Sequence, residues 1–512
     1  MSAISHHNIP NKGLVTVSVM LATIMQVLDT TIANVALPHM QGSLSATQDQ
    51  ITWVLTSYIV AAAIMTPPTG WLTGRFGRKN VFLVSIAGFT LASVMCGISI
   101  SIEEMVLFRL LQGVFGAALV PLSQSTLLDI NPKERHGSAM ALWGIGVMLG
   151  PILGPTLGGY LTEMYSWRWV FYINLPIGII SFLGISAFMF ETEPHERPFD
   201  VFGFLMLTLA IGAFQLILDR GEQVDWFDAA EICVYTGAAL AAVWMFIVHS
   251  RQTAHPFISP ELFLDRNFVA GIVFIFFVGI ILLATMALLP PFMQNLMGYP
   301  VLDVGILMAP RGIGTMVAMM IVGRASGKVD PRVMIVAGLI CTAYSLWEMA
   351  RFTTFVPQHI IVATGVVQGF GLGLIFVPLS TISFATLEMK FRTEAASLFS
   401  LVRNLGSSIG VSLVMTMLGK GIQANHQYLA ENITPYTAPL GQNYLLQGAQ
   451  AGPVAGALAQ LNGEINRQAA TIAYLNDFAM MMWVVVASIP LVLLLKNPHH
   501  KKPDEMPAMI AE

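Results

Sequence analysis

Residues 268–289 read FVAGIVFIFFVGIILLATMALL, a run of twenty-two residues without a single charged side chain. The hydrocarbon core of a bilayer is about 30 Å thick, and a helix of about 20 apolar residues crosses it. Buried helices of soluble proteins rarely need an apolar run of this length. The stretch therefore predicts a transmembrane helix.

Thirteen further apolar runs of similar length lie on either side of this one. The composition agrees, because charged residues make up 11% of the 512 residues, whereas soluble domains carry about 25%. The first run carries Asp29 and is too long for a signal peptide, so we interpret it as a retained span. The expected fold is an all-α integral membrane protein with fourteen spans, near 13–36, 51–72, 80–100, 105–128, 138–161, 168–190, 201–219, 229–249, 268–289, 303–323, 332–350, 359–380, 396–418 and 475–495.

The positions of Lys and Arg orient these spans. With the N-terminus in the cytoplasm, 17 of the 25 Lys and Arg residues fall in cytoplasmic segments, five in the opposite segments, and three within spans: Arg109, Arg311 and Arg403. Cytoplasmic loops are enriched in positive residues. We therefore expect a multi-pass protein of the inner membrane with both termini cytoplasmic. The net charge of -4 gives no indication of a nucleic-acid partner.

The first and last six spans repeat one pattern of residues. Gln112-Gly113 and Pro121-Leu122-Ser123 match Gln368-Gly369 and Pro378-Leu379-Ser380, and further glycine pairs recur at offsets between 253 and 257 residues. We expect two parallel six-helix bundles, 1–195 and 261–495, two inserted helices in 196–260, and a cytoplasmic tail, 496–512. Parallel repeats of this kind bind substrate between the halves near mid-membrane.

The fifth span, GIGVMLGPILGPTLGGYL at residues 144–161, contains a glycine at every fourth position. This spacing puts the glycines on one helix face, where a neighbouring backbone can approach closely. The prolines remove backbone donors and bend a helix. Tight packing explains part of this pattern, but two Gly-Pro pairs in register are uncommon in packing alone. The residues of this candidate motif are Gly146, Gly150, Pro151, Gly154, Pro155 and Gly158.

A short basic loop joins the second and third spans, and its candidate residues are Gly70, Arg75, Gly77 and Arg78. In the simplest interpretation the loop only fixes orientation. If its arginines contact helix ends of the other half, the loop is also a cytoplasmic latch. The sequence leaves both interpretations open.

Charged residues inside spans are energetically costly and mark functional sites by default. Asp29 and Arg109 lie at depths that differ by about 4–5 Å at ~1.5 Å per residue. Arg311 falls in the same layer, and Gln112 lies one turn from Arg109. We expect a proton-coupling cluster of these four residues, in which Asp29, the only acid well inside a span, exchanges a proton for substrate. The alternative is a static ion pair that holds the bundle together.

The segment 419–474 is predicted to lie on the periplasmic side and is rich in Gln, Asn, Ala and Gly. Its second part, 453–474, has the apolar spacing of a helix. The segment is either a docking element for a partner protein or a solvated cap without one.

Other function classes find no support. The chain contains no G-x-x-x-x-G-K-[ST] nucleotide-binding run, no metal-ligand spacing and no nucleophile motif. We therefore expect a secondary active transporter rather than an enzyme, with no cofactor and no metal. Cys96, Cys233 and Cys341 lie in apolar runs and are expected to be buried thiols.

At several of these positions the chain resembles the major facilitator superfamily, over nearly its whole length. Residues 28–38, LDTTIANVALP, resemble the first-span signature of the fourteen-span drug:proton antiporters, and the fifth span resembles the antiporter motif. RLLQG at 109–113, DVFG at 200–203 and the approach to the ninth span at 262–268 are further similarities, most of all to the EmrB/QacA group and its EmrB-like permease subunits.

The resemblance implies a proton-coupled exporter of small hydrophobic or amphipathic compounds, whose arginine at 109 takes part in coupling. It also implies a periplasmic adaptor and an outer-membrane channel as partners, contacted through 419–474. One position departs from the family, because Gly74 stands where the loop between spans 2 and 3 normally carries an acid, although Asp330 keeps an acid in the second copy. Any latch must then be built differently.

Two other functions remain open at this point. A dedicated exporter of one endogenous metabolite, such as a siderophore or a fatty acid, would ignore most unrelated dyes. A receptor or scaffold on a transporter fold would move no substrate. The acid, the arginine and the glycine face favour transport over the second of these.

Overall fold

A computed structural model describes residues 11–191, 198–222, 224–326, 328–431 and 454–495. Within these ranges every regular element is a helix, and thirteen helices are long and apolar enough to cross a membrane. A fourteenth forms if α2 (Gln48–Met65) and α3 (Thr69–Phe76), bent by 57°, count as one span. Pro67 and Pro68 lie at this bend, where their missing N–H groups interrupt the helical hydrogen bonds. The expected all-α membrane fold is confirmed.

The first six spans pack together through α1, which contacts α7 and α9, and through α5, which contacts α2 and α4. Their remaining elements are α1 (Lys12–Ser43), α4 (Arg78–Ile98), α5 (Ile102–Gly116), α6 (Leu119–Ile130), α7 (His136–Met164), α8 (Trp169–Tyr172) and α9 (Asn174–Phe188).

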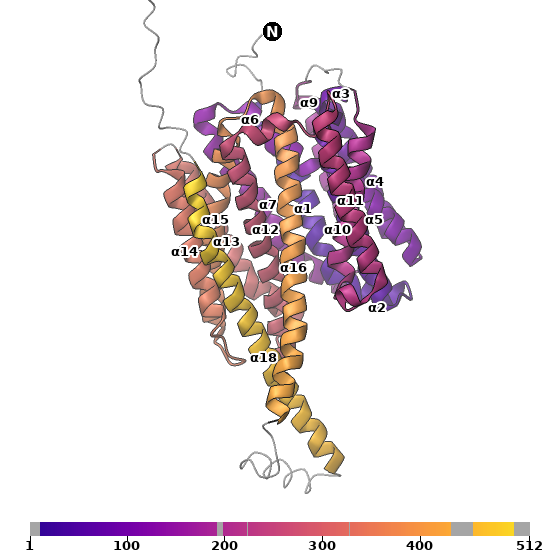
Figure 1. Cartoon of the computed structure of the whole chain (residues 1–512), viewed down its shortest axis with the longest axis vertical. Helices are drawn as coiled ribbons and strands as arrows, with labels where there is room; N and C mark the ends of the chain where they lie inside the picture. The colour runs from indigo at the N-terminus through magenta and orange to yellow at the C-terminus, as the bar shows by residue number, and fades with distance from the viewer. Residues whose placement is uncertain (1–10, 192–197, 223, 327, 432–453, 496–512) are drawn as a thin grey trace, which may run out of the picture.

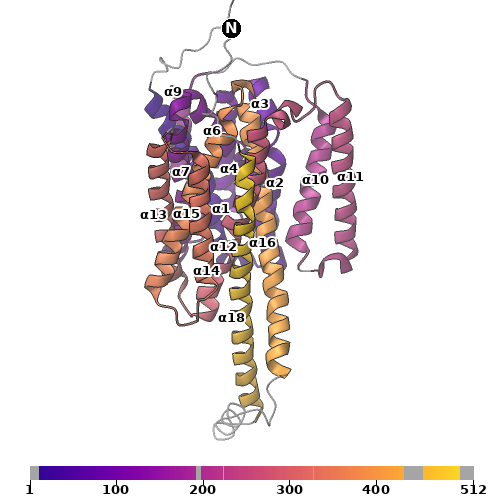
Figure 2. The ribbon, with the colours of Figure 1, turned by 60° about the vertical axis from the view of Figure 1, so that its left-hand side comes forward.

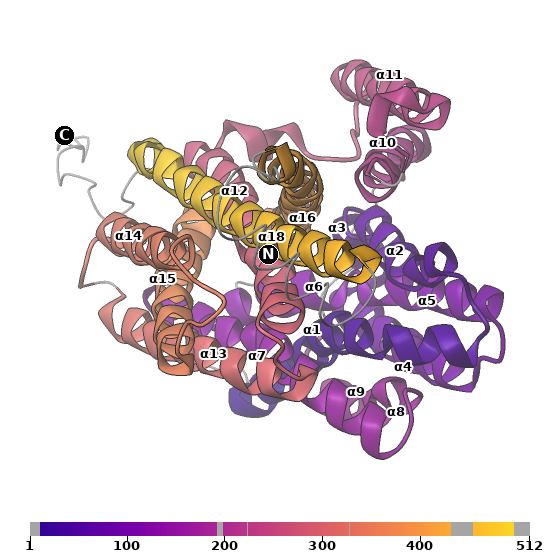
Figure 3. The same ribbon diagram turned by 90° about the horizontal axis from the view of Figure 1, so that it is seen from below.

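The last six spans form a second group. Within it α15 contacts α13 and α14, and α16 contacts α12 and α18. The elements are α12 (Arg266–Pro291), α13 (Val301–Ala325), α14 (Pro331–Met349), α15 (Gln358–Ala385), α16 (Arg392–Glu431) and α18 (Val454–Ser488). Seen along the long axis, the two groups lie side by side, with α7 and α13 meeting between them (Figure 3).

The sequence repeat is visible in the packing. Gly406 and Gly410 of α16 lie against backbone atoms of Phe276 and Ile280 on α12. In the first group, glycines at the matching positions of α7 lie against α1. The same close approach of a glycine face therefore occurs once in each group.

The inserted helices α10 (Val201–Arg220) and α11 (Ala230–Gln252) pair with each other and stand apart at the side of the molecule (Figure 2). Helix α10 packs against α2 and α16 of the rest of the bundle. Because α11 turns most of its surface outward, Cys233 on it is exposed. Cys341, on α14, is half-buried. The expectation of three buried thiols is wrong for these two and holds for Cys96.

Helices α16 and α18 continue well past the other spans and form an antiparallel stalk (Figure 1). Asn425 Nδ2 donates to the carbonyl oxygen of Ala469 at 3.3 Å, and His426 pairs with the Asn462 side chain at 2.9 Å. A helix was expected over 453–474, and α18 begins at Val454, but the extension of α16 to Glu431 was not expected. Residues 432–453 and the predicted tail 496–512 lie outside the described residues.

Candidate functional site

The centre of the candidate site is an ion pair between α1 and α5. Arg109 Nη1 lies 2.7 Å from Asp29 Oδ2, and the two side chains are 1% and 0% exposed. Burying either charge alone would cost several kcal/mol, so each depends on the other. The depth argument from the sequence thus placed these two residues in contact correctly.

Two amides complete the coordination of the Asp29 carboxylate. Its Oδ1 accepts hydrogen bonds from Gln112 Nε2 at 2.9 Å and from Asn174 Nδ2 at 2.8 Å. Gln112 Oε1 in turn accepts from Arg109 Nη1 at 2.8 Å, which closes a ring of three side chains. Asn174 also donates to Ser93 Oγ, at 2.9 Å.

The guanidinium of Arg109 is fixed on its other sides as well. Its Nε donates to the carbonyl oxygen of Val54 at 3.0 Å, and its Cζ lies 4.4 Å from the centre of the Tyr58 ring. Gln26 Nε2 donates to the Tyr58 hydroxyl at 3.0 Å. A proton bound to Asp29 would remove the negative charge that Arg109 pairs with. Protonation would therefore weaken the ion pair and leave the Arg109 charge without a counter-charge.

The glycine face of α7 packs on α1, the helix that carries Asp29. A Cβ at Gly150 would lie 2.7 Å from the carbonyl carbon of Val27, and at Gly154 it would meet the Thr31 hydroxyl. The Thr31 hydroxyl donates to the carbonyl oxygen of Gly150 at 3.0 Å. Gly146 and Gly158 continue the face against Met20 and Ile32. The side chains of Pro151 and Pro155 lie outside the described residues.

A second face of α7 meets the other group of helices. Ile152 lies against Gly312 of α13, and Thr156 lies against Gly305. Trp143 stacks on Phe376 of α15, with ring centres 5.7 Å apart. Helix α7 is therefore the element that connects the Asp29 cluster to the opposite bundle.

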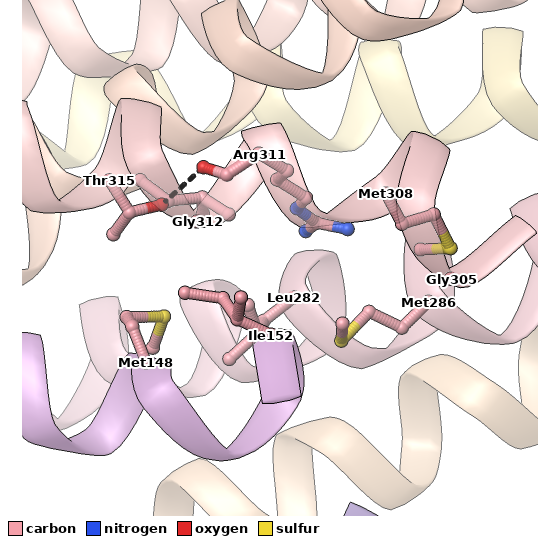
Figure 4. A pocket seen from close by; sticks show the side chains of 10 residues that line it. Met148, Ile152, Leu282, Met286, Gly305, Met308, Arg311, Gly312 and Thr315 are labelled. Carbon is pink, nitrogen blue, oxygen red and sulfur yellow. Dashed lines mark hydrogen bonds between the residues drawn. The ribbon is translucent and has the colours of Figure 1, made fainter. Parts of the chain in front are cut away.

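Arg311 does not join the Asp29 cluster, and the expectation that it flanks the carboxylate is wrong in this structure. Residue depth fixes the level of a side chain in the membrane but not its position around the bundle. Arg311 lies instead in a cavity between α7, α12, α13 and α15, and its two terminal nitrogens have no hydrogen-bond partner among the described residues. Figure 4 shows its guanidinium directed into this space between methionine and leucine side chains.

The basic loop makes a contact between the two groups at the end of the molecule predicted to face the cytoplasm. Gly77 has φ +80°, a conformation that glycine adopts without strain, and it separates α3 from α4. Arg78 then pairs with Asp129 of α6 at 2.6 Å and donates to Thr393 Oγ1 of α16 at 3.3 Å. Arg75 is exposed.

The same carboxylate binds a second arginine from the other group. Arg392 Nη1 lies 2.7 Å from Asp129 Oδ1 and 3.2 Å from the carbonyl oxygen of Leu128. We call Arg78, Asp129 and Arg392 the inter-bundle triad. All three side chains are less than 10% exposed, so the contact is a buried ionic one.

Glu394, two residues after Arg392, lies against α3, the helix that contains Gly70 and Gly74. A Cβ at Gly70 would lie 3.0 Å from the Glu394 backbone, so α3 and α16 touch here. Ser259, from the segment after the inserted helices, donates its hydroxyl to Glu394 Oε2 at 2.9 Å. Asp330, the acid of the second copy, caps α14 instead, by accepting from the Arg332 amide.

Several residues of these sites could not be recognised as site residues from the sequence. Asn174 and Ser93 are uncharged, and Asp129 and Arg392 lie at span ends, where charges are ordinary. Asp477 of α18 is also buried, and its Oδ2 has no partner among the described residues. Asp29 is therefore not the only buried acid, although Asp477 lies only two residues inside the expected span 475–495.

The chain matches known proteins over nearly its whole length. The family model described as Major Facilitator Superfamily matches residues 19–411. The chain is 36% identical over 494 residues to the "Multidrug export protein EmrB" of Escherichia coli K12, covering 95% of each chain. It is 34% identical to the "Probable multidrug resistance protein EmrY" of the same organism, over 95% of this chain and 96% of that one.

Two further similarities extend this result. The "Fatty acid resistance protein FarB" of Neisseria gonorrhoeae is 36% identical over 488 residues, which cover 95% of this chain and 96% of FarB. The crystal structure of the human organic anion transporter MFSD10 superposes with a TM-score of 0.58 at 14% identity, over 93% of this chain and all of that one, so it shares the fold. Fold, motifs and relatives agree that this multi-pass membrane protein is a transporter and belongs to the Major Facilitator Superfamily.

Proposed function

We propose that this chain is a proton-coupled antiporter that exports small hydrophobic or amphipathic compounds from the cytoplasm or the inner leaflet. The observation that carries the proposal is the Asp29 carboxylate, fully buried and held by Arg109, Gln112 and Asn174. An acid in this setting changes its interactions sharply when it gains or loses a proton. The similarity to the multidrug export protein EmrB and the probable multidrug resistance protein EmrY, at 36% and 34% identity, supports export of drugs.

Coupling requires that the state of Asp29 reach the interface between the bundles. Helix α1 carries Asp29 and, two residues away, both Val27 and Thr31, which lie against the glycines of α7. Helix α7 then contacts α13 through Ile152 and Thr156. Protonation of Asp29 releases Arg109, lets α1 shift, and so changes how α7 packs on the second bundle. The same contacts would serve a purely structural ion pair, which is the alternative to test.

The inter-bundle triad bears on two parts of the proposal: the orientation of the protein in the membrane and the closure of its cytoplasmic end. Arg78 and Arg392 are two of the 17 Lys and Arg residues assigned to cytoplasmic segments, so the end where they meet Asp129 is the cytoplasmic one by the positive-inside rule. With both termini on that side in the inner membrane, the triad closes the cytoplasmic entrance in the arrangement seen here. Entry of substrate from the cytoplasm then requires Arg392 to leave Asp129.

The stalk of α16 and α18 projects from the opposite end (Figure 2), which is the periplasmic side in this orientation. We propose that it contacts a periplasmic adaptor, which passes substrate to an outer-membrane channel. A length of helix beyond the bundle has no packing role inside the membrane, and this supports a partner there.

Reconstituted protein in liposomes with an imposed pH gradient tests the proposal. Wild-type protein is expected to move dyes or dodecanoate only while the gradient lasts, and Asp29→Asn to lose this dependence while remaining folded. If Asp29→Asn retains full gradient-driven transport, Asp29 does not couple protons to transport, and the Asp29–Arg109 ion pair has a structural role only.

A second candidate is a dedicated exporter of fatty acids. It is favoured by the 36% identity to a protein named for fatty acid resistance. Competition separates the two, because a dedicated exporter moves dodecanoate and is not inhibited by unrelated dyes.

A further inference from the structure

The cavity around Arg311 holds a cation that no acid among the described residues pairs with. Arg311 is 7% exposed, and neither Nη1 nor Nη2 has a partner among the described residues. Its neighbours in the cavity are apolar or uncharged (Figure 4): Met148, Ile152, Leu282, Met286, Met308 and Leu372, with Thr315. Thr315 donates its hydroxyl to the Arg311 carbonyl and so does not serve the guanidinium.

An unpaired buried charge is costly, and proteins retain one where a ligand supplies the counter-charge. The first bundle shows what a balanced site looks like, because Arg109 there faces Asp29. The corresponding position of the second bundle carries no acid.

At an offset of 256 residues, Thr285 stands where the first copy has Asp29, and Gly365 stands where it has Arg109. The amide is kept, since Gln368 Nε2 donates to Thr285 Oγ1 at 3.3 Å as Gln112 donates to Asp29. Arg311 packs against Gly365: a Cβ added at Gly365 would lie 3.7 Å from the Cβ of Arg311. The second copy thus lacks both charges of the pair and has one arginine from a different helix.

We infer that Arg311 binds the negatively charged head of an amphipathic substrate, a carboxylate whose apolar body lies among the methionines. The inference rests on the proposed export function and names the substrate class for it. A guanidinium with two free nitrogens matches the two oxygens of a carboxylate. Methionine side chains are flexible and accommodate apolar bodies of different shapes.

The position of the cavity agrees with this role. It lies at the contact of α7 and α13, between the two bundles, and Arg311 is ten residues from the start of α13. The free space is about 30 Å³, too small for an amphiphile. The site therefore admits its substrate only when the bundles separate, which alternating access requires.

Binding of dodecanoate and of its methyl ester to the purified full-length protein in neutral detergent tests the inference. The two ligands share the apolar chain and differ in charge. Wild-type protein should prefer dodecanoate by about tenfold to a hundredfold, the range for a hydrogen-bonded charge pair. Arg311→Gln should abolish the preference and Arg311→Lys should retain part of it. Arg351→Gln, which removes an exposed arginine from the surface, should keep it.

Thermal unfolding of the empty protein gives a second readout. Loss of an unpaired buried cation should leave the Tm of Arg311→Gln unchanged or raise it, whereas loss of a structural contact would lower it. An unchanged preference in Arg311→Gln, a lowered Tm, or no preference in the wild type would each overturn the inference. Because equilibrium binding needs no proton gradient, a wild-type preference for dodecanoate without gradient-driven transport would show a working site and failed coupling, so the two failures are distinguishable.

Discussion

The Thr31 hydroxyl of α1 and the Gly150 carbonyl of α7 form a hydrogen bond of 3.0 Å two residues from the buried Asp29. The bond requires close approach of the two backbones, which the absence of a side chain at Gly150 permits. It ties the candidate proton site to the helix that contacts the second bundle.

Gly150→Ala should therefore impair both folding and transport. Its Cβ would lie 2.7 to 2.8 Å from backbone atoms of Val27, which cannot rotate away. Overpacking of this kind costs about 1–3 kcal/mol. We expect a lowered Tm in detergent and a transport rate well below that of the wild type.

Gly159→Ala on the same helix is the matched control. A Cβ at Gly159 would have no neighbour within 4 Å. We expect wild-type transport and an unchanged or slightly raised Tm, since alanine favours helix. Equal behaviour of the two variants would show that the α1–α7 contact does not depend on the glycine face.

Asp129→Asn should open the end of the molecule that the triad holds closed. The variant leaves the guanidinium groups of Arg78 and Arg392 without their charged partner, a loss that costs about 3–5 kcal/mol for a buried pair. Ser326 packs against Gly137 where α7 and α13 meet at this end. In a background without Cys233 and Cys341, maleimide should label Ser326→Cys about tenfold faster when Asp129 is also changed.

Glu388→Gln provides the comparison for the triad. Glu388 pairs with Lys390 at 2.9 Å in a loop at the same end, but the side chains are 68% and 65% exposed. Exposed pairs contribute little, so labelling should match the wild type. If Asp129→Asn also labels at the wild-type rate, the triad does not hold this end closed.

Gly421→Leu should separate the stalk helices. A Cβ at Gly421 would lie 3.2 Å from the Ala473 Cβ, whereas Gly463 has no neighbour within 4 Å. If the stalk binds an adaptor, Gly421→Leu should lower the resistance that the protein gives to cells and spare transport in liposomes. Gly463→Leu should affect neither. Normal resistance with Gly421→Leu would argue against a role of the paired stalk in docking.

The sequence allowed prediction of the features that depend on one helix at a time. The long apolar runs gave the spans, and counting residues from a span end brought Asp29 and Arg109 to one level, where they pair. The same counting misplaced Arg311, because the neighbours of a helix are set by packing, and α13 lies against α7 and α15.

Other parts of the site depend on contacts that no spacing reveals. Asn174 is an uncharged residue at the start of α9 and is recognised only through its bonds to Asp29 and Ser93. Arg392 and Asp129 are 263 residues apart and at ends of spans. The stalk was only half predicted, because the polar composition after residue 418 concealed the continuation of α16.

Proton movement coupled to substrate tests the central claim most directly. The wild-type protein is reconstituted with a pH-sensitive dye inside the liposomes, and a probe that it transports is placed on one side. The account predicts that the probe gradient drives protons in the opposite direction. In Asp29→Asn this proton movement should disappear while exchange of labelled for unlabelled probe continues. Proton movement that persists in Asp29→Asn at the wild-type ratio to substrate would contradict the account.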